Sequence, residues 1–152
     1  MGIKNGIHIE GLDKLIKDIQ TFGEDGEQMV AEITEGNARE IEATAKQIAP
    51  YDLGTLRQEI RSYTSIESRG TFWKIEANAN GRAPYSAYQE FGTGGLVDIP
   101  PELAEMAINF KGKGVKKINL PARPFLYPAF VIGREQYYQD LKDGLNDLTN
   151  KI

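Results

Sequence analysis

Residues 24–48, EDGEQMVAEITEGNAREIEATAKQI, decide the fold, because they contain a long amphipathic pattern. Apolar residues recur at every third or fourth position, and most residues on the opposite side are Glu, Gln or Lys. The pattern predicts one long helix with a weak point at Gly36. The helix should end at Ala49, because Pro50 disfavours the helical conformation of the residue before it. The side that faces the core comprises Met29, Val30, Ile33, Asn37, Ile41, Thr44, Ala45 and Ile48.

Weaker patterns on both sides of this helix predict the remaining elements. Residues 1–22 indicate a short strand or arm followed by a short helix. Residues 60–79 are rich in Ile, Thr and Tyr and should form a β-hairpin that turns at residues 68–71. Residues 127–150 keep an apolar spacing of three or four and predict a C-terminal helix. We therefore predict a single α+β domain over residues 1–152, with both long helices packed on a small antiparallel sheet.

Residues 92–122 are rich in Gly and Pro and predict a long irregular loop. A helical turn is expected at PELAEMAINF, residues 101–110. Structureless loops of this length are unusual inside a compact domain, and they tend to be functional or disordered.

The charges of this loop are segregated. The chain carries 18 Lys and Arg against 22 Asp and Glu, for a net charge of -4. Residues 109–123 nevertheless contain five cations and no acid, which is typical of a mobile basic loop. One interpretation is a solvated loop, and the other is contact with a polyanion such as DNA. The five cations are Lys111, Lys113, Lys116, Lys117 and Arg123.

The composition excludes many enzyme classes. There is no cysteine, and His8 is the single histidine, so thiolate nucleophiles, zinc-thiolate sites and all-histidine metal sites are absent. FGTGG, residues 91–95, lacks the lysine of a phosphate-binding loop. Glu102 and Glu105 are expected to be surface charges, because a solvated loop cannot separate their pKa values for acid–base catalysis. We expect no enzymatic activity, no cofactor and no metal.

The sequence also gives no sign of a membrane association. No run approaches the roughly 20 apolar residues that a membrane helix needs. The start MGIKNGIHIE lacks the cationic and then apolar order of a signal peptide. We expect a protein that is made in a cytoplasm and has no membrane partner.

Two further segments predict a clamp at the ends of the long loop. Tyr85, Tyr88 and Phe91 recur at every third residue and should form an aromatic stripe in the core. Phe125 and Leu126, flanked by Pro124 and Pro128, form a rigid apolar plug that should pack on this stripe. Glu90 lies in the same apolar stretch and would need a cationic or backbone partner if buried, with Arg57 or Arg123 as candidate cations.

Three segments resemble the neck or tail-completion proteins of long-tailed bacteriophages, which are head–tail connector and minor tail components. These segments are IEGLDKLIKDI (9–19), APYDLGTLRQEI (49–60), and APYSAYQEFGTGG (83–95) followed by PARPFLYPAF (121–130). The positions that carry the family pattern are Gly54, Leu56, Arg57, Tyr85, Tyr88, Glu90, Phe91, Gly92, Thr93, Pro124, Phe125, Leu126, Pro128 and Ala129.

The resemblance implies a structural virion protein of the neck and tail that is assembled in the bacterial host cytoplasm. Such proteins are expected to form rings, commonly hexamers, between head-completion proteins and the tail-terminator or tail-tube proteins. In such a ring the basic loop would line the channel through which double-stranded DNA passes, or would dock on a neighbouring ring protein. The alternative function is a small DNA-binding regulator that uses the same loop and the hairpin residue Trp73.

Overall fold

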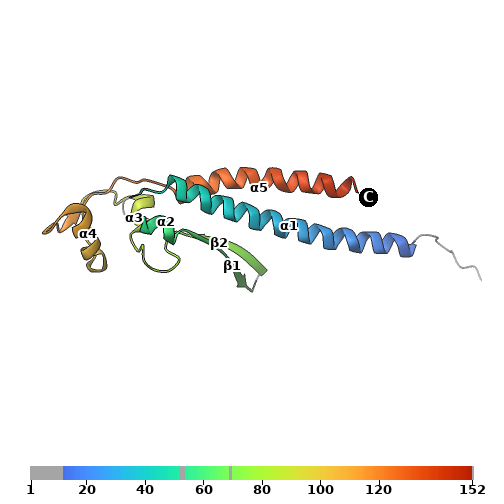
Figure 1. Ribbon diagram of the computed structural model, residues 1–152, viewed down its shortest axis with the longest axis horizontal. Helices are drawn as coiled ribbons and strands as arrows, with labels where there is room; N and C mark the ends of the chain where they lie inside the picture. The colour runs from blue at the N-terminus through green and yellow to red at the C-terminus, as the bar shows by residue number, and fades with distance from the viewer. Residues whose placement is uncertain (1–11, 52–53, 69, 152) are drawn as a thin grey trace, which may run out of the picture.

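The computed structural model describes residues 12–51, 54–68 and 70–151 (Figure 1). The predicted N-terminal arm falls on residues 1–11 and so lies outside the described residues. In chain order the elements are α1 (Leu12–Ile48), α2 (Thr55–Glu59), β1 (Arg61–Glu67), β2 (Gly70–Glu76), α3 (Ser86–Phe91), β3 (Val97–Asp98), the 3-10 helix η1 (Pro101–Leu103), α4 (Ala104–Lys111), β4 (Lys117–Ile118) and α5 (Leu126–Thr149).

The helix α1 is a single rod of 37 residues, about 55 Å long at 1.5 Å per residue. The expected separation into a short helix and a long helix at Gly23 is wrong. A glycine inside an exposed helix costs only about 1 kcal/mol relative to alanine, which the neighbouring turns can offset. The helix ends at Ile48, just before the predicted stop.

The two long helices lie side by side and antiparallel (Figure 1). Two glycines of α5 permit this approach: a Cβ at Gly133 would lie 2.1 Å from Cγ1 of Ile41, and one at Gly144 would lie 2.6 Å from Sδ of Met29. Near the first contact, the buried side-chain amide of Asn37 donates to the carbonyl oxygen of Gly133 at 2.7 Å. The C-terminal helix therefore packs on α1.

The predicted hairpin is formed by β1 and β2, which pair antiparallel from Arg61↔Glu76 to Glu67↔Gly70. It packs on α1, whereas α5 lies along the other side of that helix (Figure 1). The carboxylate of Glu42 on α1 holds the first strand, because both the N–H (2.7 Å) and the hydroxyl (2.6 Å) of Ser62 donate to its Oε2. Glu42 also pairs with Lys46.

Residues 92–122 contain more structure than the predicted irregular loop. The expected helical turn is present as η1 and α4. In addition, β3 and β4 pair antiparallel, with Val97 opposite Ile118 and Asp98 opposite Lys117. We call residues 93–122 the end unit, because it lies at the end of the molecule opposite the C-terminus (Figure 1).

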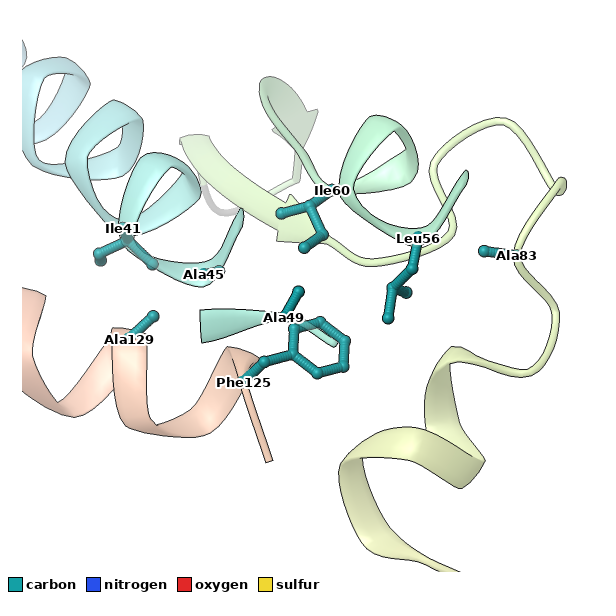
Figure 2. Close-up of a cluster of buried hydrophobic side chains, with 8 residues drawn as sticks. All are labelled: Ile41, Ala45, Ala49, Leu56, Ile60, Ala83, Phe125 and Ala129. Atoms are coloured by element: carbon teal, nitrogen blue, oxygen red, sulfur yellow. The ribbon is translucent and has the colours of Figure 1, made fainter. Parts of the chain in front are cut away.

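The hydrophobic core lies where α1, α2 and the start of α5 meet. Four of its eight buried residues are alanines, and Phe125 is its largest side chain. Figure 2 shows the ring of Phe125 beside Ala49, facing Leu56. The core comprises Ile41, Ala45, Ala49, Leu56, Ile60, Ala83, Phe125 and Ala129.

Candidate functional site: the clamp and the basic end

The carboxylate of Glu90 joins α3 to the start of α5. Its Oε2 accepts the N–H groups of Phe125 (2.8 Å) and Leu126 (2.9 Å), and its Oε1 accepts the N–H of Tyr127 (2.8 Å). Glu90 is buried, so these bonds are made away from bulk water. Backbone donors at a helix start carry partial positive charge, which favours an anionic acceptor.

This single carboxylate satisfies the whole N-terminus of α5. An α-helix leaves four N–H groups without an intrahelical acceptor, those of the N-cap residue and the first three helical residues. In α5 these residues are Phe125, Leu126, Tyr127 and Pro128. Glu90 accepts from the first three, and proline has no N–H. The N-cap residue itself makes no side-chain cap, so the cap comes from 35 residues earlier in the chain.

The partners of Glu90 are therefore backbone groups, and the two arginine candidates are wrong. The Arg57 guanidinium instead donates to the carbonyl oxygen of Ala49 (2.9 Å from Nη2), just after the end of α1, and lies 4.9 Å from the ring centre of Tyr51. Arg123 acts through its backbone, whose N–H donates to the carbonyl oxygen of Gln89 at 2.8 Å. A carboxylate beside a helix start can accept from the free backbone N–H groups of that helix. Such partners carry no charged side chain, so the pattern of charges in the sequence does not reveal them.

Gly92 and Thr93 complete the clamp. The N–H of Thr93 donates to the carbonyl oxygen of Leu120 (3.0 Å), and the N–H of Leu120 donates to Oγ1 of Thr93 (2.9 Å). Gly92 has φ +69°, and a Cβ there would lie 2.7 Å from the backbone nitrogen of Ala122. A side chain does not fit between these two backbones. The chain thus enters and leaves the end unit at one place.

The aromatic stripe is divided between three environments. Tyr85 packs on the core that contains Phe125, as expected for the plug. Tyr88 is half-buried and lines a cavity beside the end unit. Phe91 is 76% exposed, so its expected place in the core is wrong. The last turn of α3 directs it to an open groove that also contains Leu126, Tyr127 and Phe130.

A second buried carboxylate, Glu59, went unnoticed in the sequence. It accepts from the backbone N–H (2.7 Å) of Asn80, and from the backbone N–H (3.3 Å) and Nε (2.7 Å) of Arg82. Burial raises the pKa of Glu59, but these hydrogen bonds outweigh it and lower the pKa to about 2. Its position in the sequence indicates burial, because Glu59 lies between the apolar residues Leu56 and Ile60, both of which are buried in the structure. The bonds of Glu59 to Asn80 and Arg82 fix the turn that precedes Ala83. At the other end of the same helix, Gly54 is the N-cap of α2 and has φ +76°.

The five basic residues of 109–123 are all exposed, and two of them lie in elements of the end unit, whereas the other three lie in connecting segments or at its exit. Lys111 ends α4, and Lys117 lies in β4, where its Nζ is 4.0 Å from Oδ1 of Asp98. Lys113 and Lys116 lie between these elements, and Arg123 lies beside Pro124, just before the buried plug. The predicted loop thus contains short helical and strand segments, and its cations lie on the surface.

The described hairpin has no freely exposed aromatic face at Trp73 on which a nucleic-acid base could stack. Trp73 is half-buried, and the guanidinium of Arg39 lies 5.7 Å from its ring centre. A base that stacks on this face would have to displace the arginine. No feature of the described hairpin therefore favours the regulator alternative.

One comparison with known proteins found a match. A family model described as "Bacteriophage HK97-gp10, putative tail-component" matches residues 13–92, which is just over half of the chain. The match extends from α1 to Gly92, the first backbone contact of the clamp. No curated protein and no solved structure matches the chain significantly.

Proposed function

The chain belongs to the HK97-gp10-like family of bacteriophage tail components, and from this membership we propose that it is a tail-completion protein of the virion neck. In this proposal several copies, six in the simplest case, form a ring around the DNA channel. The ring joins the head-completion proteins to the tail-terminator or tail-tube proteins. The observation that carries the proposal is the family match over residues 13–92.

The shape of the chain supports assembly. The described part of the chain is elongated, because α1 and α5 extend well beyond the small core (Figure 1). Specific interfaces bury roughly 1,200–2,000 Å² in total. An elongated chain with a small, alanine-rich core thus has surface to spare for neighbours on two sides.

Exposed apolar side chains support the same view. Tyr127, Tyr138 and Leu145 on α5 are 67%, 62% and 51% exposed, and Phe91 adds a further aromatic surface near the start of that helix. Apolar side chains that gather on one exposed surface mark interaction sites. Ring neighbours or the adjacent neck proteins are the partners that we propose for it.

The basic end unit supports a channel around DNA. In a six-fold ring the cations of residues 109–123 would bring about 30 positive charges to one annulus, offset in part by Asp98, Glu102 and Glu105 of each copy, and they would attract phosphates without reading the sequence. Contact with a neighbouring ring protein is the other use that we consider for these side chains. Within residues 12–51, 54–68 and 70–151, no helix has the length and apolarity that crossing a bilayer requires.

Electron microscopy of phage lysates tests the proposal. A stop codon in place of Gln28 in the source phage or prophage should give filled heads beside unattached tails. Abnormal tail ends among the free tails would support the tail-completion role specifically. Normal infectious particles would refute the connector role. The matched control is the same stop codon with a complementing copy of the intact gene, which should restore attachment.

A further inference from the structure

A cavity of about 250 Å³ lies between α3 and the end unit. Its walls are largely apolar and come from β3, η1, α4 and β4, with Tyr88 of α3 opposite. Among the described residues that line it there are two cations, Lys111 and Arg123, and no carboxylate. The apolar wall includes Val97, Ile99, Leu103, Ala107, Ile118 and Leu120.

The size and lining of this cavity suit part of a protein segment. Small-molecule sites usually measure roughly 300–1,000 Å³, so this cavity is suited to one or two side chains. Its apolar wall favours an apolar side chain, and the two cations favour carboxylates beside it. Among the described residues, no carboxylate forms an ion pair with Lys111 or Arg123, so both remain available to a partner.

The chain itself carries a surface of the complementary kind. Around Gly26 of α1, where an added Cβ would lie 3.7 Å from Cδ2 of Leu148 of α5, both helices are acidic. There is no Lys or Arg between residues 18 and 38, and Lys142 is the single base between residues 135 and 149. Val30 and Leu145 are 41% and 51% exposed on the same stretch. We call this surface the acidic end, and its carboxylates are Glu24, Asp25, Glu27, Asp143 and Asp147.

The two surfaces lie at opposite ends of the molecule, as Figure 1 shows for α4 and the C-terminal end of α5. They cannot meet within one chain, so a contact between them must join two copies. We propose that the cavity of one copy binds the acidic end of the next. Such a contact joins different surfaces of identical chains and therefore propagates into a closed ring or an open chain. This inference rests on the proposed ring and specifies its subunit contact.

The cavity favours protein over DNA as the partner of Lys111 and Arg123. Phosphate contacts need only exposed cations, and a charged sugar–phosphate backbone has no large apolar side chain to fill walls of Val, Ile and Leu. Lys113 and Lys116 are absent from the lining and are exposed beside it, so they remain available to phosphates. The basic residues thus divide into a subunit contact and a DNA contact.

Sedimentation velocity of the purified full-length protein tests this contact through charge reversal. The cavity variant carries Lys111→Glu and Arg123→Glu, and the acidic-end variant carries Glu24→Lys, Asp25→Lys and Glu27→Lys. Each variant alone should associate at least tenfold more weakly than the parent chain. A 1:1 mixture should associate again, because every cavity then meets an end of opposite charge. Circular dichroism on each sample establishes that the variants are folded.

The matched control is Lys113→Glu with Lys116→Glu, which makes the same charge change beside the cavity. It should leave self-association within twofold of the parent value. An equal loss in this control, or a folded mixture that fails to associate, would overturn the proposal. A cavity variant that loses only binding to a 30-base-pair duplex would assign the site to DNA instead. A parent chain that stays monomeric at about 1 mM would also overturn this contact. The neck role is tested separately, by electron microscopy of the lysates.

Discussion

The N–H of Phe125 lies 2.8 Å from Oε2 of Glu90, and both residues are buried. The bond links the last turn of α3 to the first residue before α5. The same residue, Phe125, provides the largest side chain of the core. One point of contact therefore fixes a helix start, the core and the exit of the end unit together.

Replacement of Glu90 should weaken the fold strongly. Glu90→Ala leaves three backbone donors without an acceptor, and a loss of about 3 kcal/mol in the free energy of unfolding is expected. Glu90→Gln should lose roughly half as much, since one oxygen still accepts. Urea unfolding followed by circular dichroism measures both, with the exposed Glu102→Gln as control. Equal stability of the alanine variant and the parent would show that the cap is dispensable.

The clamp can be opened at Gly92 without touching the core. In Gly92→Ala the new Cβ would meet Ala122 and Leu120, so the amide hydrogens of Thr93 and Leu120 should lose protection from exchange. Gly94→Ala is the matched control, because its φ is +68° and nothing lies within 4 Å of the added carbon. Both variants carry the backbone strain, and only the first carries the steric conflict. Equal protection in the two variants would contradict the close approach.

The contact between the long helices should be sensitive to one methyl group. Gly133→Ala places a Cβ 2.1 Å from Cγ1 of Ile41, and overpacking of this kind costs about 1–3 kcal/mol. The same substitution at Gly36, where nothing lies within 4 Å, should stabilise α1 by up to about 1 kcal/mol. In thermal unfolding, the midpoint temperature should fall for Gly133→Ala and rise for Gly36→Ala. A stabilised Gly133→Ala would mean that the helices are further apart than described.

Acid should destabilise the protein through two glutamates. Burial raises the pKa of Glu42 and of Glu59, but their hydrogen bonds outweigh it and lower both values from 4.5 to about 2. A depressed pKa gives stability that is complete above pH 4.5 and is lost as the pH falls toward 2. The free energy of unfolding should therefore fall over this range, and Glu59→Gln should make the fall shallower. An unchanged pH slope in that variant would exclude Glu59 as a source.

DNA binding at the basic end should depend on salt and on Lys113 and Lys116. Replacing both with Gln should reduce the slope of log Kd against log salt concentration by about 2, since each phosphate contact contributes about 1. Fluorescence anisotropy of a labelled duplex with the assembled protein measures this slope. A sequence-dependent affinity would instead favour a regulator. An unchanged slope together with an unchanged phage yield would remove DNA as a partner of these lysines.

Periodic patterns of sufficient length predicted the main elements of the fold. The apolar spacing of residues 24–48 and of residues 127–150 gave the two long helices, and the β-branched stretch gave the hairpin. The pairing of β3 with β4 escaped detection, because strands of two residues have no period to recognise. Gly23 suggested a break that the flanking helical turns override.

The candidate site was predicted less completely. Proline-flanked Phe125 and the Tyr85 segment pointed to a packed pair, and both residues do belong to the core region. Spacing alone placed Phe91 with them, although the helix turns it outward to 76% exposure. The partners of Glu90 are N–H groups that every residue other than proline possesses, so no sequence pattern identifies them. Tertiary packing decides that Lys111 and Arg123 line the cavity whereas Lys113 and Lys116 do not, so the sequence does not reveal this difference either.

Because of the clamp, the number of residues in the end unit does not affect the geometry of the rest of the protein. The carbonyl of Gln89 and the N–H of Arg123 are hydrogen-bonded neighbours, so the segment between them departs from and returns to a single point. The entropy of closing such an excursion grows only slowly with its length. Insertions or deletions within it would therefore leave the paired helices and the hairpin in place. The packing of α1 on α5 and on the hairpin therefore does not depend on the number of residues in the end unit.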